Sequence, residues 1–174
     1  MNRSVHELPH PERYRVIDLG DLRRIRVPFR LGQDEFDTGT DVCFKSLADV
    51  ADPYLDGNVY HASANLVPST KPPYTGTRWQ LQLNADGTWS ILNQGQEDQM
   101  LSGSGQQVGL GHQPTSALQM RFTTTRWQLY RDRTGFRLRP GTAGWLAVKD
   151  GRLVLADPGD PPGRWLYWQI SKAE

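Results

Sequence analysis

The residues best suited to bind a polar ligand lie in residues 56–61 (DGNVYH), with Asn65 shortly after them. A sugar site needs a carboxylate or amide that accepts hydrogen bonds from paired hydroxyls, and an aromatic face for the C–H side of the ring. The candidates that supply these groups are Asp56, Asn58, Tyr60 and Asn65. The alternative is structural, because Asp-Gly-Asn is also a common polar hairpin turn.

The remaining reactive residues give little indication of a catalytic site. The four histidines, at positions 6, 10, 61 and 112, fall at no metal-ligand spacing. No nucleophile-elbow, phosphate-loop or zinc-protease motif is present. The single cysteine, Cys43, has no histidine that the sequence assigns to it, and its reactivity stays open. We therefore expect a non-enzymatic protein with no cofactor and no metal.

These candidate residues belong to a chain with a threefold internal repeat, which decides the fold. The tripeptide at 79–81 (WQL) returns at 127–129 (WQL) and at 168–170 (WQI). The pairs at 54–55 (YL), 100–101 (ML) and 145–146 (WL) keep the same spacing, as do the strand onsets at 42–44, 89–91 and 136–138. Matched tryptophans in a symmetric structure are core residues, so Trp79, Trp127 and Trp168 are expected to be buried.

Each unit is expected to form four short strands. Residues 135–139 (GFRLR) alternate apolar and polar side chains, as a half-buried strand does. Asp150-Gly151 separates two apolar runs and indicates a hairpin. Three four-stranded units favour an all-β β-trefoil over a propeller, which needs at least four blades. The expected repeats are about 39–83, 84–131 and 132–174, with an N-terminal extension at 1–38 packed on the trefoil.

Residues 79–91 (WQLQLNADGTWSI) resemble the unit boundary of ricin-B-type lectin domains, in which a late tryptophan precedes an Asp-Gly-type turn and the next unit's first strand. The resemblance covers about residues 39–174 and implies a trefoil fold and sugar binding. In that family a sugar-binding carboxylate follows the marker leucine of the second strand. The matching positions here are Asp56, Ser102 and Ala147, so the resemblance implies a sugar site in the first unit only.

Trp165 has no counterpart in the other units and is a candidate partner-binding residue. Its matching residues are Gly76 and Thr124, and it follows a stiff proline-rich loop at 158–163. An unmatched tryptophan on such a loop is suited to anchor a partner. The alternative, which we favour, is that Trp165 packs on residues 1–38.

The N-terminal extension contains an alternating segment at 24–31 (RIRVPFRL), with arginines on one face and apolar residues on the other. Pro28 favours an edge strand. Acidic residues follow directly, so the arginines are expected to have internal partners rather than nucleic acid. We expect this arm to wrap the barrel or to form a homodimer contact.

Composition narrows the class of protein further. The formal net charge is +1 and the mean hydropathy is −0.63, with no run long enough for a membrane span. The first residues lack the apolar stretch of a secretory signal, so we expect a cytoplasmic protein, with release by a non-classical route left open.

Two functions from different classes remain. The leading hypothesis is a non-catalytic, lectin-like module that binds a glycan or glycoconjugate in the first unit. The alternative is a protein-binding trefoil, such as a protease inhibitor or a toxin or assembly component. In that case the proline-rich loops at 67–76 and 158–163, or Trp165, would carry the contact.

Overall fold

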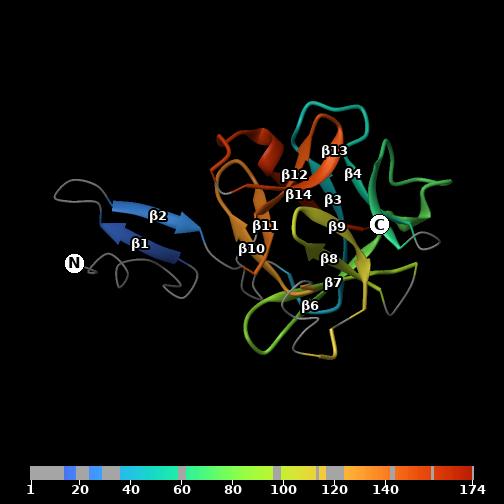
Figure 1. The fold of residues 1–174 in the computed structure, drawn as a ribbon, viewed down its shortest axis with the longest axis horizontal. Helices are drawn as coiled ribbons and strands as arrows, with labels where there is room; N and C mark the ends of the chain where they lie inside the picture. Colours follow the sequence, from blue (N-terminus) through green and yellow to red (C-terminus); the bar gives the residue numbers. More distant parts are fainter. Residues whose placement is uncertain are drawn as a thin grey trace.

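The computed structural model describes the strands 14–18 and 24–28 and residues 36–58, 62–95, 99–112, 114–116, 124–141, 144–157 and 159–173. These residues form an all-β structure (Figure 1). Its helical content, in the described part, is limited to two 3-10 turns, η2 (Thr75–Thr77) and η3 (Arg164–Leu166).

Six strands pair into a closed ring. They are β3 (Thr40–Ser46), β6 (Trp79–Leu83), β7 (Trp89–Asn93), β10 (Trp127–Arg131), β11 (Phe136–Pro140) and β14 (Trp168–Lys172). Following the pairings from β3 leads through β6, β7, β10, β11 and β14 back to β3, and every pairing is antiparallel. Each strand of the ring therefore has a partner on both edges.

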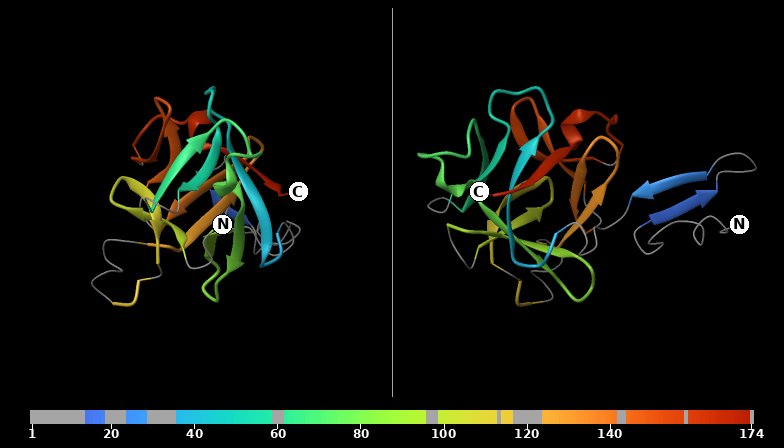
Figure 2. Two further views of the ribbon diagram at one scale, coloured as in Figure 1. Left: turned by 90° about the vertical axis from the view of Figure 1, so that its right-hand side faces the viewer. Right: turned by 180° about the vertical axis from the view of Figure 1, so that it is seen from behind.

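Three hairpins complete the body of the molecule (Figure 2). They are β4 (Tyr54–Asn58) with β5 (Ser63–Val67), β8 (Met100–Ser104) with β9 (Gln107–Gly111), and β12 (Trp145–Lys149) with β13 (Arg152–Ala156). The predicted turn of the third hairpin is confirmed. Asp150 and Gly151 both have positive φ, 53° and 74°, as a tight two-residue hairpin turn requires.

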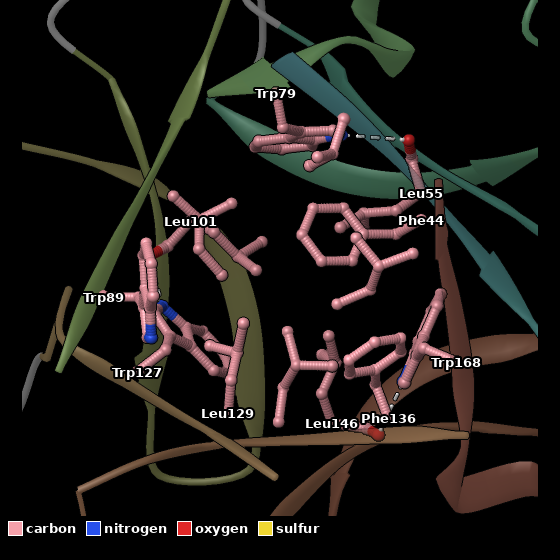
Figure 3. Close-up of a cluster of buried hydrophobic side chains, with 14 of the residues drawn as sticks. Phe44, Leu55, Trp79, Trp89, Leu101, Trp127, Leu129, Phe136, Leu146 and Trp168 are labelled. Atoms are coloured by element: carbon pink, nitrogen blue, oxygen red, sulfur yellow. Dashed lines mark hydrogen bonds between the residues drawn. The ribbon is translucent and has the colours of Figure 1, made fainter. Parts of the chain in front are cut away.

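The core follows from the alternation of the strands. In β11 the side chains of Phe136, Leu138 and Pro140 are buried, while Arg137 and Arg139 lie on the outer face. The same pattern puts Val42 and Phe44 of β3, and Trp89 and Ile91 of β7, into one hydrophobic cluster. Side chains from all six strands of the ring thus meet in a shared interior (Figure 3).

The three matched tryptophans are buried, as predicted, and each one makes the same type of hydrogen bond. Trp79, Trp127 and Trp168 have no exposed surface. Their indole Nε1 atoms donate to the backbone carbonyls of the marker leucines Leu55, Leu101 and Leu146, at 3.2, 2.8 and 2.9 Å. Figure 3 shows two of these bonds, those of Trp79 and Trp168. Each hydrogen bond joins the last strand of a unit to the first strand of that unit's hairpin.

The two earliest strands form a separate two-stranded sheet. β1 (Tyr14–Asp18) pairs with β2 (Arg24–Pro28), with Tyr14 opposite Pro28. The strand predicted at 24–31 is thus present over its first five residues, and the rest of that segment lies outside the described residues. This sheet shares no strand pairing with the ring. The packing of residues 1–38 on the body stays a prediction.

Candidate functional site

The structure places the predicted sugar residues on the outer face of the first hairpin. Asp56 of β4 lies directly opposite Asn65 of β5, so these two predicted residues are brought together. Asn58 shares the same face of β4, and Asn65 is exposed. Tyr60, which should supply the aromatic face, lies outside the described residues.

Asp56 is half-buried and already serves a structural contact. It accepts a hydrogen bond from the backbone N–H of Gly76, in η2. Burial raises the pKa of Asp56 above its usual range, and the hydrogen bond from Gly76 opposes that rise. A methyl group added at Gly76 would lie 2.7 Å from Oδ1 of Asp56, so glycine allows this close approach. Asp56 therefore anchors the segment that lies over it.

That segment, residues 70–78, forms one wall of a hollow of about 780 Å³. We call it the tyrosine hollow, because Tyr54 and Tyr74 line it. The rest of its lining comes from β3, from Gln94 and Gly95 after β7, and from the end of β14. Its volume falls within the range of small-molecule sites. The hollow therefore gathers residues from the beginning, middle and end of the described chain.

The wall that carries Tyr74 is held by a buried amide. Asn93 at the end of β7 has no exposed surface, and its Nδ2 donates to the carbonyl of Gly76 at 3.0 Å. The hydroxyl of Thr77 donates to the carbonyl of Tyr74 at 3.4 Å, and the Tyr74 N–H donates to the carbonyl of Lys71 at 3.0 Å. Tyr74 therefore projects from a segment that is fixed before any ligand binds.

The two tyrosines differ in how free their rings are. The ammonium group of Lys45 lies over the Tyr54 ring, 5.6 Å from its centroid. Tyr74 is half-buried, and its ring makes no ring-stacking or cation contact with the described residues. An unengaged aromatic face beside polar groups is what the C–H side of a sugar ring packs on. Tyr74 is therefore the better candidate for that contact.

The polar side of the hollow is organised around Asp41. The Gln94 amide donates to Oδ1 of Asp41 at 2.6 Å, and an Arg78 Nη1 atom lies 4.0 Å from Oδ2. Cys43 also lines the hollow, and burial raises the pKa of its thiol while the charge of Arg78 lowers it. A thiol with a raised pKa is protonated near neutral pH, so Cys43 has little nucleophilic character.

The second unit has a hollow of different character. It measures about 620 Å³ and lies between β5, β8 and β9. Ser102, the residue matched to Asp56, contributes to it and is itself buried. The described lining is made mostly of serine, glycine and apolar residues, with His112 at its edge and no Tyr, Trp or Phe among them. These described residues do not form a broad aromatic face like that of the tyrosine hollow.

Trp165 packs within its own unit. It lies in η3 and packs against a small cluster formed by Ala147, Ala156 and Leu166, and it is partly buried. The ammonium group of Lys149 lies 5.9 Å from its ring centroid. The predicted contact between Trp165 and residues 1–38 stays a prediction, because most of that segment lies outside the described residues.

A second aromatic group lies on the outer face of the third unit. The half-buried Trp145 has the guanidinium groups of Arg137 and Arg139 at 4.6 and 5.2 Å from its ring centroid. Tyr130 meets the same ring edge-on at 5.3 Å. The Tyr167 hydroxyl donates to Asp132 at 2.6 Å, and Arg137 lies 4.0 Å from that carboxylate. The aromatic rings and charged groups of this surface are thus engaged with one another.

The sequence reasoning missed Tyr74, Gln94 and Asp41 as a group. The loop at 67–76, which contains Tyr74, is a candidate contact loop only under the protein-binding alternative. The signal available was an aromatic residue after two prolines. No groups of His, Cys, Asp or Glu suited to hold a metal ion occur among the described residues, and no helix found there could cross a membrane.

No family model matches the chain, and no curated protein is significantly similar in sequence. Solved structures do resemble it. Cry35Ab1 superposes with a TM-score of 0.63 at 11% identity, over 80% of this chain and 37% of its own. A mosquitocidal holotoxin gives 0.62 at 14%, over 78% and 17%. A GlcNAcα1-4Gal-releasing endo-β-galactosidase from Clostridium perfringens gives 0.60 at 13%, over 87% and 36%.

At these identities the likeness shows the fold alone. The chain spans less than two fifths of each of these proteins. All three contain an all-β region of the same architecture as the described residues, within a longer polypeptide.

Proposed function

We propose that the chain is a non-catalytic, carbohydrate-binding β-trefoil. Two features support the trefoil assignment. The closed ring of six strands and the three hairpins divide into three units of four strands, at the positions of the sequence repeat. The tryptophan-to-leucine hydrogen bond recurs once in each unit. A threefold recurrence of the same buried contact is what three copies of one unit produce.

The sugar site is the tyrosine hollow. The observation that carries this assignment is the unengaged ring of Tyr74 in the lining of a hollow that also contains the Gln94 amide and the Asp41 carboxylate. An aromatic face and planar polar groups across a concave site of this volume are the pattern of small-molecule recognition. Asp56, on the outer face of β4, supports the wall of this hollow through Gly76.

The resembling proteins are consistent with this proposal. One of the three is named for its action on a galactose-containing glycan, and another is named as a mosquitocidal holotoxin. In each, a region of this fold is part of a larger protein, which is how a ligand-binding module is used.

The test is a glycan array on the full chain, followed by titration calorimetry with each hit. We expect Tyr74→Ala to weaken binding at least about fivefold, since a stacked aromatic contact contributes about 1 kcal/mol or more. Tyr130→Ala, a half-buried tyrosine outside the hollow, is the matched control and should bind as the wild type does.

A parallel variant separates the hollow from the first hairpin. Asp56→Asn keeps an acceptor for the Gly76 N–H and should leave glycan binding within about twofold. Loss of binding in Asp56→Asn with retention in Tyr74→Ala would move the site to the Asp56–Asn65 face. An array without a hit would refute carbohydrate binding.

A protein-binding function is the second candidate, and one observation favours it. Trp145 with its stacked Arg137 and Arg139 is a partly exposed cluster of the residue types that are enriched at protein interfaces. Trp165 lies on the neighbouring η3 turn, in the same small cluster as Trp145. Retention of one stable protein partner by the wild type, lost in Trp145→Ala but kept in Tyr74→Ala, would support this function.

A further inference from the structure

The charges around the tyrosine hollow are unequal. Among the described residues, its lining includes three basic side chains, Lys71, Arg78 and Lys172, and one carboxylate, Asp41. The whole chain has a formal net charge of only +1. The local excess therefore reflects where these residues are placed and not the overall composition.

The single carboxylate is already engaged. Gln94 donates to one oxygen of Asp41 at 2.6 Å, and Arg78 lies within 4.0 Å of the other. Asp41 thus offsets much of the charge of Arg78 and has little capacity left to repel an incoming anion. The two lysines are left as the net positive charge of the described lining.

Both lysines are exposed and available. The ammonium groups of Lys71 and Lys172 form no ion pair or hydrogen bond with the described residues. Lys71 belongs to the segment that carries Tyr74, and Lys172 is at the end of β14. A concave site lined by like charges raises the local concentration of the opposite charge. The hollow therefore favours an anion over a neutral ligand of the same shape.

The other lining groups suit a sugar rather than a simple anion. The Tyr74 ring supplies an apolar face, and Thr75 and Ser171 add hydroxyl groups at the margin. We propose that the tyrosine hollow selects acidic glycans, with a sugar carboxylate held by Lys71 and Lys172 while the pyranose ring lies on Tyr74. This inference rests on the proposed function and specifies the class of sugar.

The experiment compares matched acidic and neutral sugars by titration calorimetry on the full chain. The pairs are sialyllactose with lactose, and digalacturonic acid with galactobiose. We expect the acidic member of at least one pair to bind about tenfold more tightly in 20 mM salt. That advantage should shrink in 300 mM salt, because added ions screen exposed charges.

Charge-removing variants locate the effect. Lys71→Gln and Lys172→Gln should each reduce the acidic preference several-fold while leaving the neutral sugar unaffected. Lys149→Gln removes the same charge from β12, outside the hollow, and should change nothing. All three lysines are exposed, so the thermal midpoints of the variants are expected to match that of the wild type.

The failure of this inference differs from the failure of the proposed function. Equal affinity for the acidic and neutral members would overturn acidic selection and leave carbohydrate binding standing. An acidic preference that survives in both Lys71→Gln and Lys172→Gln would also overturn it, because the charge would then act elsewhere. Absence of binding to any sugar would overturn both.

Discussion

Trp89 and Trp127 offer a comparison of two buried tryptophans that differ in one interaction. They lie opposite each other across the β7–β10 pairing, and neither has any exposed surface. The Trp127 indole donates to the Leu101 carbonyl at 2.8 Å. The Trp89 Nε1 atom is buried and has no hydrogen-bond partner among the described residues. Replacing each by phenylalanine removes the same atoms from the same core.

The expected costs follow from the two environments. Each substitution removes a few buried ring atoms, which destabilises the fold by about 1–2 kcal/mol. Trp127→Phe also removes the partner of a buried carbonyl, which costs about 1–3 kcal/mol more. Trp89→Phe removes a buried donor that has no partner, and the loss of that unfavourable group stabilises the fold by a similar amount. We therefore expect Trp127→Phe to lower the free energy of unfolding by about 3 kcal/mol, and Trp89→Phe to change it by less than about 1 kcal/mol.

Urea unfolding followed by far-UV circular dichroism measures both variants. Backbone ellipticity is the better probe, since the chain has six tryptophans and their fluorescence is composite. The m-values should stay equal to that of the wild type, so that the midpoints report stability. Equal destabilisation of the two variants would refute the reasoning, because it would mean that the repeated hydrogen bond adds nothing beyond the buried ring.

Two carboxylates give opposite pH dependences. The pKa of Asp86 is lowered from 3.8 to about 2 by the Thr88 hydroxyl, then by the Thr88 N–H and by Arg126, with desolvation opposing them. The Asp86 side chain is about half exposed, so we expect Asp86→Asn to lower the free energy of unfolding at pH 7 by only about 0.5–1 kcal/mol. The difference between the urea midpoints of wild type and variant should disappear as pH falls from 3.8 to 2. The raised pKa of Asp56 has the reverse sign, so wild-type stability should fall as pH rises from 3.8 through that raised pKa. Asp56→Asn should therefore be at least as stable as the wild type at pH 7 and equally stable at pH 3. A variant that is clearly less stable than the wild type at pH 7 would contradict this, because it would show that the charge of Asp56 stabilises the fold.

The strands and the core were predictable because they depend on local, repeated signals. The alternation at 135–139 appears as β11, and Asp150-Gly151 forms the turn expected of it. The matched tryptophans are buried because the same position in each unit faces the same interior. Their hydrogen bonds to the marker leucines were not predicted, since sequence spacing does not show which carbonyl an indole reaches.

The candidate site was less predictable, and Asp56 illustrates the reason. Its residue type and its place after the marker leucine both indicated a ligand-binding carboxylate. The structure adds a contact that the sequence did not indicate, because η2 folds over β4 and the Gly76 N–H donates a hydrogen bond to that carboxylate. The closeness of these two segments depends on tertiary packing through Asn93, which is seventeen residues from Gly76 in sequence. Residues 56 and 65, by contrast, lie directly opposite each other because a short hairpin joins them.

The tyrosine hollow arises where threefold similarity ends. Its walls come from β3, from residues 70–78 and from the end of β14, so it lies where the first strand of the ring meets the last. The third unit has no equivalent of Tyr74's open ring, because the position that matches Tyr74 is Gly163, two residues before Trp165. The second unit has a bridge between Gly103 and Thr124, the residue that matches Gly76, and the described residues that line its hollow include no tyrosine. Of the two hollows described above, the tyrosine hollow is the one in which the described residues supply an aromatic face, and we therefore predict a single sugar per chain.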